Sequence, residues 1–197
     1  MMSTWLNGEW GTKEYQKAKE KNFTILCNEL KSTPKRILDI GCGLAWESRM
    51  FNQRFGTELW LIDGDVSANK IKDSSSSEIN FHKSTDTFLF YHELDFLKEE
   101  LDKRETKNYH LIDVNNINIP LDIKFDLVTS WLSCGFHYPA STYKDLVMRH
   151  SDKNTRIFFD IRTHLKTKEI FYNDSTIEIV KIYDKHRKHI TAEIKFK

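Results

Sequence analysis

The feature that most constrains the fold is a strand that runs directly into a glycine turn and a helix, within residues 36–48. The segment reads Arg36-Ile-Leu-Asp-Ile-Gly-Cys-Gly-Leu-Ala-Trp-Glu-Ser48. Its apolar part is typical of a buried strand. Gly41 and Gly43 allow a sharp turn and a close approach to a ligand, because neither residue carries a Cβ. The helix that follows offers free N–H groups and a positive dipole end.

A second apolar strand, Leu59-Trp-Leu-Ile-Asp63, ends in an acid 22 residues after Gly41. An acid at about this spacing, at a neighbouring strand end, is suited to bind a pair of ribose hydroxyls. We therefore expect a nucleoside-containing cofactor across these two strand ends. Asp65 either shares the ribose or caps the next helix.

Composition indicates a single globular domain. Of the 197 residues, 39% are apolar and 30% are charged. The net charge of +1 argues against a dominant phosphate-binding face but allows a local basic patch. Three scattered cysteines with no C-x-x-C pair indicate a reducing compartment and no zinc ribbon. No apolar run approaches the roughly 20 residues that span a bilayer, and residues 1–11 lack a signal-peptide core, so we expect a cytoplasmic protein without a membrane partner.

The rest of the chain alternates strands and helices and ends in a hairpin. We predict helices over 13–31, 45–55, 85–105 and 141–150, and further strands over 109–114, 125–132, 156–161, 176–183 and 189–196. This order predicts one α/β domain with a mostly parallel sheet and a hairpin at one edge. Residues 1–34 form an N-terminal helical cap and 35–197 the core. Ligands of such sheets bind at the carboxyl ends of the strands.

Position 46 separates two classes of cofactor. The dinucleotide fingerprint G-x-G-x-x-G/A requires a small third residue for close packing under a pyrophosphate, and this chain has Trp46 there. S-adenosylmethionine carries no pyrophosphate and needs no such close approach. NAD and FAD are therefore disfavoured.

The segment Asp39-Ile-Gly-Cys-Gly43, with Asp63 closing the second strand, resembles the class I S-adenosylmethionine-dependent methyltransferases. The resemblance extends to Asp113 after the third strand and to Phe125-Asp-Leu-Val128 in the fourth. It implies a Rossmann-like, doubly wound, mostly parallel sheet of seven strands, with an antiparallel edge strand supplied by the C-terminal hairpin. It also implies S-adenosyl-L-methionine as the cofactor.

The resemblance implies a role for each matching residue. Gly41 and Gly43 would pass under the methionine part of the cofactor, while Asp39 would help to position its amino group. Asp63 would hold the ribose hydroxyls, and Asp113 would accept from the adenine amino group. The full set that we expect to contact the cofactor is Asp39, Gly41, Cys42, Gly43, Trp46, Glu47, Asp63, Gly64, Asp113, Val114, Ser130 and Trp131.

His137 is the candidate general base. It lies in the loop after the fourth strand, where the transferred methyl should point, and the ordinary histidine pKa of about 6.5 suits proton removal near neutral pH. The alternative is a loop histidine that only packs. Candidates for the acceptor pocket are Trp10, Tyr138, Tyr143 and Asp160.

Other aromatic and histidine residues have structural alternatives. Trp5 and Trp10 either clasp the domain or form a lid over the ligands. His92 lies on an apolar helical face and is expected in the core. His186 and His189 have the spacing of a metal pair, but the positively charged turn between them disfavours a cation, so no metal is expected.

We expect methyl transfer to a small molecule, with a hydroxyl of a sugar or similar metabolite as the leading acceptor. The stretch Ser130-Trp-Leu-Ser133 lacks the Asn/Asp-Pro-Pro-aromatic motif of DNA amino-methylating enzymes. The near-neutral charge also disfavours a nucleic-acid partner. The alternatives are a nucleic-acid or protein methyltransferase, a protein that binds or degrades S-adenosylmethionine without methyl transfer, and a nicotinamide oxidoreductase.

Overall fold

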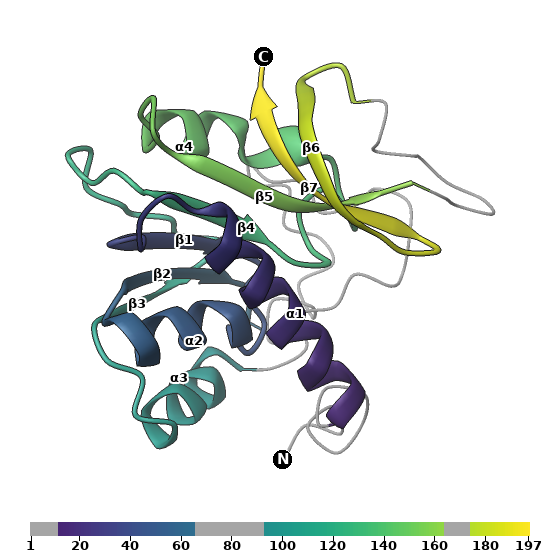
Figure 1. Cartoon of the computed structure of the whole chain (residues 1–197). Coiled ribbons are helices and arrows are strands. Elements are labelled where there is room, and N and C mark those ends of the chain that lie inside the picture. The colour runs from purple at the N-terminus through teal and green to yellow at the C-terminus, as the bar shows by residue number, and fades with distance from the viewer. Residues whose placement is uncertain (1–11, 66–92, 164–173) are drawn as a thin grey trace.

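We describe the fold from a computed structural model, in which residues 12–65, 93–163 and 174–197 are described (Figure 1). A seven-stranded sheet has the strand order β3-β2-β1-β4-β5-β7-β6. The strands are β1 (Arg36–Ile40), β2 (Glu58–Asp63), β3 (Tyr109–Asp113), β4 (Leu127–Ser130), β5 (Arg156–Arg162), β6 (Ile177–Lys185) and β7 (His189–Phe196). The helices are α1 (Lys13–Glu29), α2 (Trp46–Phe55), α3 (Leu94–Lys103), the 3₁₀ helix η3 (Ala140–Tyr143) and α4 (Lys144–Arg149).

The sheet is mixed. The strands from β3 to β5 pair in parallel, whereas β7 is antiparallel to both of its neighbours, β5 and β6. The β6–β7 hairpin is attached at one edge of the sheet, as the sequence predicts, with β7 paired to β5 and β6 as the edge strand. Burial explains this order: Ile190, Ala192 and Ile194 of β7 are all at most 5% exposed, while most of β6 is open to solvent.

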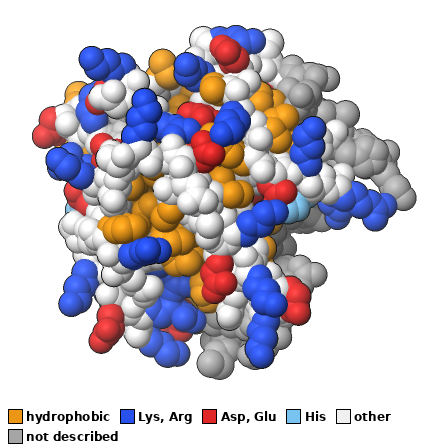
Figure 2. All heavy atoms as spheres, in the orientation of Figure 1, with side chains coloured by type: hydrophobic (Ala, Val, Ile, Leu, Met, Phe, Trp, Pro, Cys, Tyr) orange, Lys and Arg blue, Asp and Glu red, His pale blue; other side chains and the backbone are white. Residues whose placement is uncertain are grey.

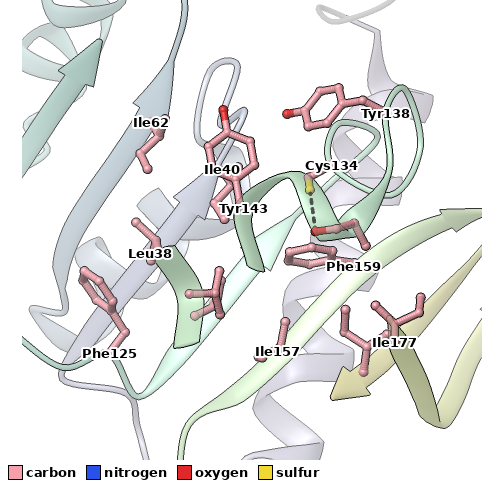
Figure 3. Packing of buried hydrophobic residues seen from close by; sticks show 14 of the residues in the cluster. Leu38, Ile40, Ile62, Phe125, Cys134, Tyr138, Tyr143, Ile157, Phe159 and Ile177 are labelled. Atoms are coloured by element: carbon pink, nitrogen blue, oxygen red, sulfur yellow. Dashed lines mark hydrogen bonds between the residues drawn. The ribbon is translucent and has the colours of Figure 1, made fainter. Parts of the chain in front are cut away.

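Side chains alternate between two apolar layers, as the strand period of two requires. Ile37, Leu59 and Phe158 pack in the layer that contains α1, α2 and α3. Leu38, Trp60 and Phe159 pack in the opposite layer, which contains α4 and the loop after β4. Figure 3 shows part of this second layer, where the Cys134 Sγ–H donates to the carbonyl oxygen of Ala140 at 3.5 Å. The sheet is covered on both faces, as a doubly wound fold requires.

Three element bounds differ from the sequence prediction for local reasons. β4 covers only the middle of the predicted strand 125–132, since Leu132 adopts a positive φ of 51° that ends the extended chain. The helix predicted over 45–55 begins one residue later, as α2, since Ala45 adopts a positive φ of 49° that is not helical. The predicted helix 85–105 is α3 in its described part, and its residues 85–92, His92 included, lie outside the described residues.

Helix α1 is attached to both halves of the sheet. The Phe23 ring packs on Phe51 of α2 with centroids 4.8 Å apart. At the other side, Lys181 of β6 donates to both carboxylate oxygens of Glu29 at 2.9 Å. These contacts join the C-terminal half of α1 to α2 on one side and to the β6–β7 hairpin on the other. In the described part of the chain, no helix is both long enough and apolar enough to cross a membrane.

Candidate functional site

The glycine turn after β1 is fixed to the end of β2. The N–H groups of Gly41 and Cys42 both donate to the Ile62 carbonyl oxygen, at 2.8 and 3.1 Å. Gly41 and Gly43 have positive φ values of 64° and 54°, which side-chain-bearing residues rarely adopt. A Cβ on Gly41 would also lie only 1.8 Å from Ser133 Oγ. The loop after β4 therefore lies directly on this turn, and glycine is required at position 41 for both reasons.

The Asp63 carboxylate lies across the glycine turn. Its Oδ2 accepts from the Gly43 N–H at 2.6 Å, and its Oδ1 accepts from the Gly64 N–H at 2.7 Å. Cys42 Sγ is 3.8 Å from the same Oδ2. Burial raises the pKa of the Cys42 thiol, and the Asp63 charge raises it further, so this cysteine stays protonated. Cys42, Gly43 and Gly64 thus surround the Asp63 carboxylate.

Asp113 stands beside Asp63 at the same sheet edge. The two residues are register partners in the parallel β2–β3 pair, which puts their backbones about 4.8 Å apart. The Val114 N–H donates to the Asp63 carbonyl oxygen at 2.8 Å. The backbone N–H and the side-chain amide of Asn115 both donate to Asp113 Oδ1, at 2.8 and 3.1 Å. Two neighbouring carboxylates thus border the space above the glycine turn.

Of the two roles considered for Asp65, sharing the ribose or capping the next helix, the structure shows a contact that belongs to the second. Asp65 Oδ2 accepts from the N–H of Leu94, the first residue of α3, at 2.9 Å. This bond satisfies one of the N–H groups that a helix start leaves without an intrahelical partner. Asp65 therefore holds the start of α3.

Asp39 is buried beneath the start of α2. It is 1% exposed, and its Oδ2 accepts from the Ser48 hydroxyl at 2.6 Å. Oδ1 has no hydrogen-bond partner among the described residues, and neither has the buried hydroxyl of Thr129, the register partner of Asp39 on β4. Burial raises the pKa of Asp39 to about 7. This acid thus keeps a proton to near neutral pH and has one unused oxygen.

Glu47 pairs with α1. Lys19 Nζ lies 3.0 Å from its Oε1, both side chains are at most 8% exposed, and the Asn22 amide donates to the same oxygen at 2.9 Å. Burial lowers the pKa of Lys19, but the Glu47 charge more than offsets this and leaves that pKa above its ordinary value. The sequence did not single out Lys19. A signal existed, because Lys19 lies one turn before Phe23 on the apolar face of the helix.

The two candidate tryptophans lie in the layer of α1, α2 and α3. The Trp46 ring is flanked by the guanidinium groups of Arg49 and Arg104, at 4.6 and 5.4 Å. This packing against the helices explains why a bulky residue is accepted after the glycine turn. Trp131 is 7% exposed, and its indole N–H, like that of Trp46, is buried without a hydrogen-bond partner among the described residues.

Ser130 holds the loop that follows β4. Its hydroxyl donates to the Ile40 carbonyl oxygen at 2.7 Å and accepts from the Cys134 N–H at 2.8 Å. The side chain is fully buried, so its hydrogen bonds serve the loop itself. Further along, the Ser133 and Tyr138 hydroxyls are 2.9 Å apart. Ser130 thereby sets the position from which this loop covers Gly41.

Tyr138 and Tyr143 lie together beside the glycine turn (Figure 3). Their ring centroids are 6.1 Å apart. Burial raises the pKa of both phenols well above the ordinary value, with a contribution to each from the Asp63 charge. Both tyrosines therefore stay protonated and can donate hydrogen bonds. Their role in the acceptor pocket stays a prediction. Trp5 and Trp10 lie outside the described residues.

The remaining candidates are Asp160, near the end of β5, and His137, in the loop after β4. The Asp160 carboxylate accepts from the Thr191 hydroxyl at 2.7 Å and from the Leu132 N–H at 3.1 Å. Burial raises its pKa to about 7, and its Oδ1 lies 3.9 Å from His189 Nε2. His137 is half-buried, with its ring 4.8 Å from that of Phe136. His186 and His189 have the spacing of a metal pair, although no metal was expected from the sequence; in the structure the two rings are stacked 4.3 Å apart.

Comparison with known proteins identifies the fold. No protein-family model and no curated protein matches the chain. Among solved structures, the PH0226 protein from Pyrococcus horikoshii OT3 matches with a TM-score of 0.64 and 12% identity, over 98% of this chain and 95% of that one. A SAM-dependent methyltransferase from Aquifex aeolicus has a TM-score of 0.56 and 11% identity, over 91% and 88%. MtNAS in complex with MTA and tNA has a TM-score of 0.59 and 9% identity, over 95% and 62%. The chain therefore has the fold of S-adenosylmethionine-dependent methyltransferases.

Proposed function

We propose that the chain is an S-adenosylmethionine-dependent methyltransferase that acts on a small-molecule acceptor. The observation that carries this proposal is the Asp63 carboxylate, which two backbone N–H groups hold directly over the glycine turn. Asp113 stands next to it in register. On a methyltransferase fold, this pair of acids is suited to the two ends of an adenosine.

The residues present fit the cofactor. Asp63 would bind the ribose hydroxyls, while Asp113 and the Val114 backbone would bind the adenine. The methionine part would lie at Gly41 and Gly43, where positive φ values bring the backbone close. Asp39 offers a buried oxygen without a partner for the amino group, and this is an unsatisfied acceptor that a bound cation would use. Cys42 and Gly64 would line the same turn by their backbones.

Four further residues would hold the cofactor site in place: Trp46, Glu47, Ser130 and Trp131. Glu47 and Trp46 connect the turn to α1 and α2, and Ser130 fixes the loop after β4. We propose that the whole chain acts as one domain, with residues 1–34 as a helical cap on the core 35–197. The Lys19–Glu47 pair supports this, because it joins the cap to the residue that follows Trp46.

The bound cofactor would supply a methyl group already activated by its positively charged sulfur. The remaining task of the protein is to orient the acceptor, which lowers such barriers by up to roughly 7–11 kcal/mol. Tyr138 and Tyr143 would donate hydrogen bonds to the acceptor, and Trp10 would contact it. For a hydroxyl of a sugar or similar metabolite, His137 would take the proton that the oxygen loses. Asp160 would hold the far side of this pocket.

Calorimetric titration with S-adenosylhomocysteine tests the cofactor assignment. We expect binding that Asp63→Ala weakens by roughly 10- to 150-fold, since a charge-assisted hydrogen-bond pair contributes about 1.5–3 kcal/mol. Asp122→Ala is the matched control, because it removes the same charge from an exposed loop. No binding by the wild type at millimolar ligand would refute the proposal.

A second candidate function is cleavage of the cofactor without methyl transfer. It is favoured by the similarity to MtNAS, whose structure is a complex with MTA. Quantifying both nucleoside products of labelled S-adenosylmethionine separates the two. S-adenosylhomocysteine that appears only with an acceptor present supports the methyltransferase. Methylthioadenosine formed without an acceptor would support cleavage instead.

A further inference from the structure

We propose that the end of β5 carries a binding site for an anionic group of the acceptor, a phosphate or a carboxylate, with Arg162 as its main cation and His189 beside it. The proposal rests on the proposed function, because it assigns the bound anion to the methyl acceptor. It narrows the acceptor from any small metabolite to one that is negatively charged.

Three segments distant in sequence form this site. Arg162 is the last residue of β5 and the register partner of His189, the first residue of β7. The Arg162 guanidinium lies 4.0 Å from the centre of the Phe136 ring, in the loop after β4. The same ring meets the His189 ring edge-on, with centroids 5.4 Å apart. Phe136 thus holds both basic side chains in place while forming no hydrogen bond with either.

Comparison with Arg156 shows that Arg162 lacks an acidic partner among the described residues. The two arginines lie at opposite ends of β5 and, an even number of residues apart, on one face. Arg156 donates to both oxygens of Glu193, at 2.7 and 2.6 Å. Arg162 makes no ion pair with any described residue, and its Nε is buried without a hydrogen-bond partner. An arginine fork that is fixed by stacking and has no acidic partner in the described part of the chain is suited to bind a carboxylate or phosphate.

The described acids that face His189, the register partner of Arg162, are already engaged or partly neutralised. Asp184 pairs with Lys21, and its Oδ2 lies 3.0 Å from His186 Nε2. Asp160 is buried with its oxygens bound to Thr191 and Leu132, and burial raises its pKa to about 7. Neither acid offers a full free charge to Arg162. Positive potential from the arginine is therefore available to a ligand.

The surroundings of His189 are positive as well. Burial, together with the nearby His186, Lys19 and Arg162, lowers its pKa to about 4, and Asp184 opposes this only in part. The charged and titratable groups that face it are Lys19 on α1, Asp160 and Arg162 on β5, Asp184 on β6 and His186 in the turn. The ring is therefore neutral at pH 7 and can donate one hydrogen bond. Figure 2 shows Lys and Arg side chains gathered with histidine at this end of the β6–β7 hairpin, whose turn includes the exposed Lys185, Arg187 and Lys188.

The position and extent of the cluster favour a small acceptor. Arg162 follows the carboxyl end of a parallel strand, the edge where ligands of such sheets bind. Its neighbour Phe136 belongs to the loop that also carries Ser133 and Tyr138 over the glycine turn. The exposed cations of this cluster, Lys185, Arg187 and Lys188, all lie at a single hairpin turn. Nucleic acids, in contrast, are bound through many phosphate contacts. A single anionic group fits this arrangement.

Binding of inorganic phosphate, and separately of acetate, tests the site without any methyl transfer. The full-length protein is titrated at constant ionic strength while the His189 ring is followed by nuclear magnetic resonance. We expect saturable shifts and a rise in the His189 pKa, because a bound anion favours the charged ring. Arg162→Gln should weaken the binding at least tenfold, and Arg162→Lys should weaken it less. Arg149→Gln, which removes an exposed arginine at the end of α4, should leave it unchanged.

Two outcomes would overturn the proposal, and both leave the cofactor assignment intact. One is a non-saturating shift that is the same in wild type and Arg162→Gln. The other comes from transfer of tritium from labelled S-adenosylmethionine into a small-molecule extract. A labelled product that an anion-exchange resin does not retain at pH 8, or labelling found only in RNA, would overturn the proposal. We expect a retained product, and a KM for its precursor that rises tenfold or more in Arg162→Gln with a smaller change in kcat. Thermal unfolding confirms that each variant is folded, and S-adenosylhomocysteine binding reports the cofactor site separately.

Discussion

Two groups of residues along the carboxyl ends of the parallel strands differ in charge and in the contacts that hold them in place. At the β1–β3 end, Asp63 and Asp113 present carboxylates, and backbone N–H groups hold both in place. At the β5–β7 end, Arg162 and His189 present basic groups, and an aromatic ring, Phe136, holds both. The first end suits the hydroxyls and amino group of a nucleoside, and the second suits an anion.

The difference in construction explains what each end demands of the sequence. One backbone bond at Asp63 comes from the adjacent Gly64 and the other from the glycine turn 20 residues away, which is a recognisable sequence motif. The stacking at Arg162 joins segments that are 26 residues apart, and the register with His189 joins segments 27 apart. No local motif encodes such contacts. The loop after β4 belongs to both ends, since Ser133 lies on Gly41 and Phe136 lies on Arg162.

The largest effect is expected at Lys19, which lies between the two ends. Lys19→Met should lower the free energy of unfolding by about 3–5 kcal/mol, because Glu47 is left as a buried charge without its cation. The double variant Lys19→Met/Glu47→Gln should recover most of this loss, since both charges are then gone. Urea unfolding at pH 7 measures both. A double variant as unstable as the single one would show that packing, and not the charge, gives Lys19 its role.

The second effect tests whether the loop after β4 depends on the glycine turn. Gly41→Ala should cost about 2–4 kcal/mol, which combines the strain of a positive φ with the close contact to Ser133. Gly56→Ala is the matched control, because its φ is 71° and its Cβ would meet nothing within 4 Å. That variant should lose only the strain, about 1–2 kcal/mol. Equal losses in urea unfolding would contradict the close contact.

The sequence predicted the β1–β3 end better than the β5–β7 end. The order of strands and helices followed from periodicity, and so did the meeting of Gly43, Asp63 and Asp113, because parallel strands bring their ends to one edge. Hydrogen-bond partners could not be predicted in the same way. Ser130 lies in an apolar strand, but the sequence does not show that its hydroxyl is bonded to Ile40 and Cys134. Arg162 was missed because its significance is the absence of an acid among its described neighbours, which only the three-dimensional structure reveals.

The third effect compares one buried acid from each end. Asp39 and Asp160 both have a pKa of about 7, well above the ordinary value near 4. Between pH 4 and 7 the unfolded chain therefore releases these protons before the folded one does, so stability falls as pH rises through this window. Each acid contributes a slope of at most about 1.4 kcal/mol per pH unit. Unfolding measured from pH 5 to 7 should show a shallower fall in Asp39→Asn and in Asp160→Asn, and an unchanged slope in either would remove that acid from the explanation.

The smallest effect distinguishes the two ends by their response to salt. Lys188 is exposed in the β6–β7 turn, so Lys188→Gln should weaken phosphate binding at Arg162 only about two- to fivefold, as expected for a screened surface charge. Raising the ionic strength from 0.05 to 0.5 M, roughly a threefold shorter screening length, should reduce the difference between this variant and the wild type. S-adenosylhomocysteine binding should change little, because hydrogen bonds at Asp63 and Asp113 act at contact distance. A cofactor affinity that falls with salt as steeply as phosphate affinity would show that the two ends share one electrostatic field, and the separation into an acidic donor end and a basic acceptor end would then fail.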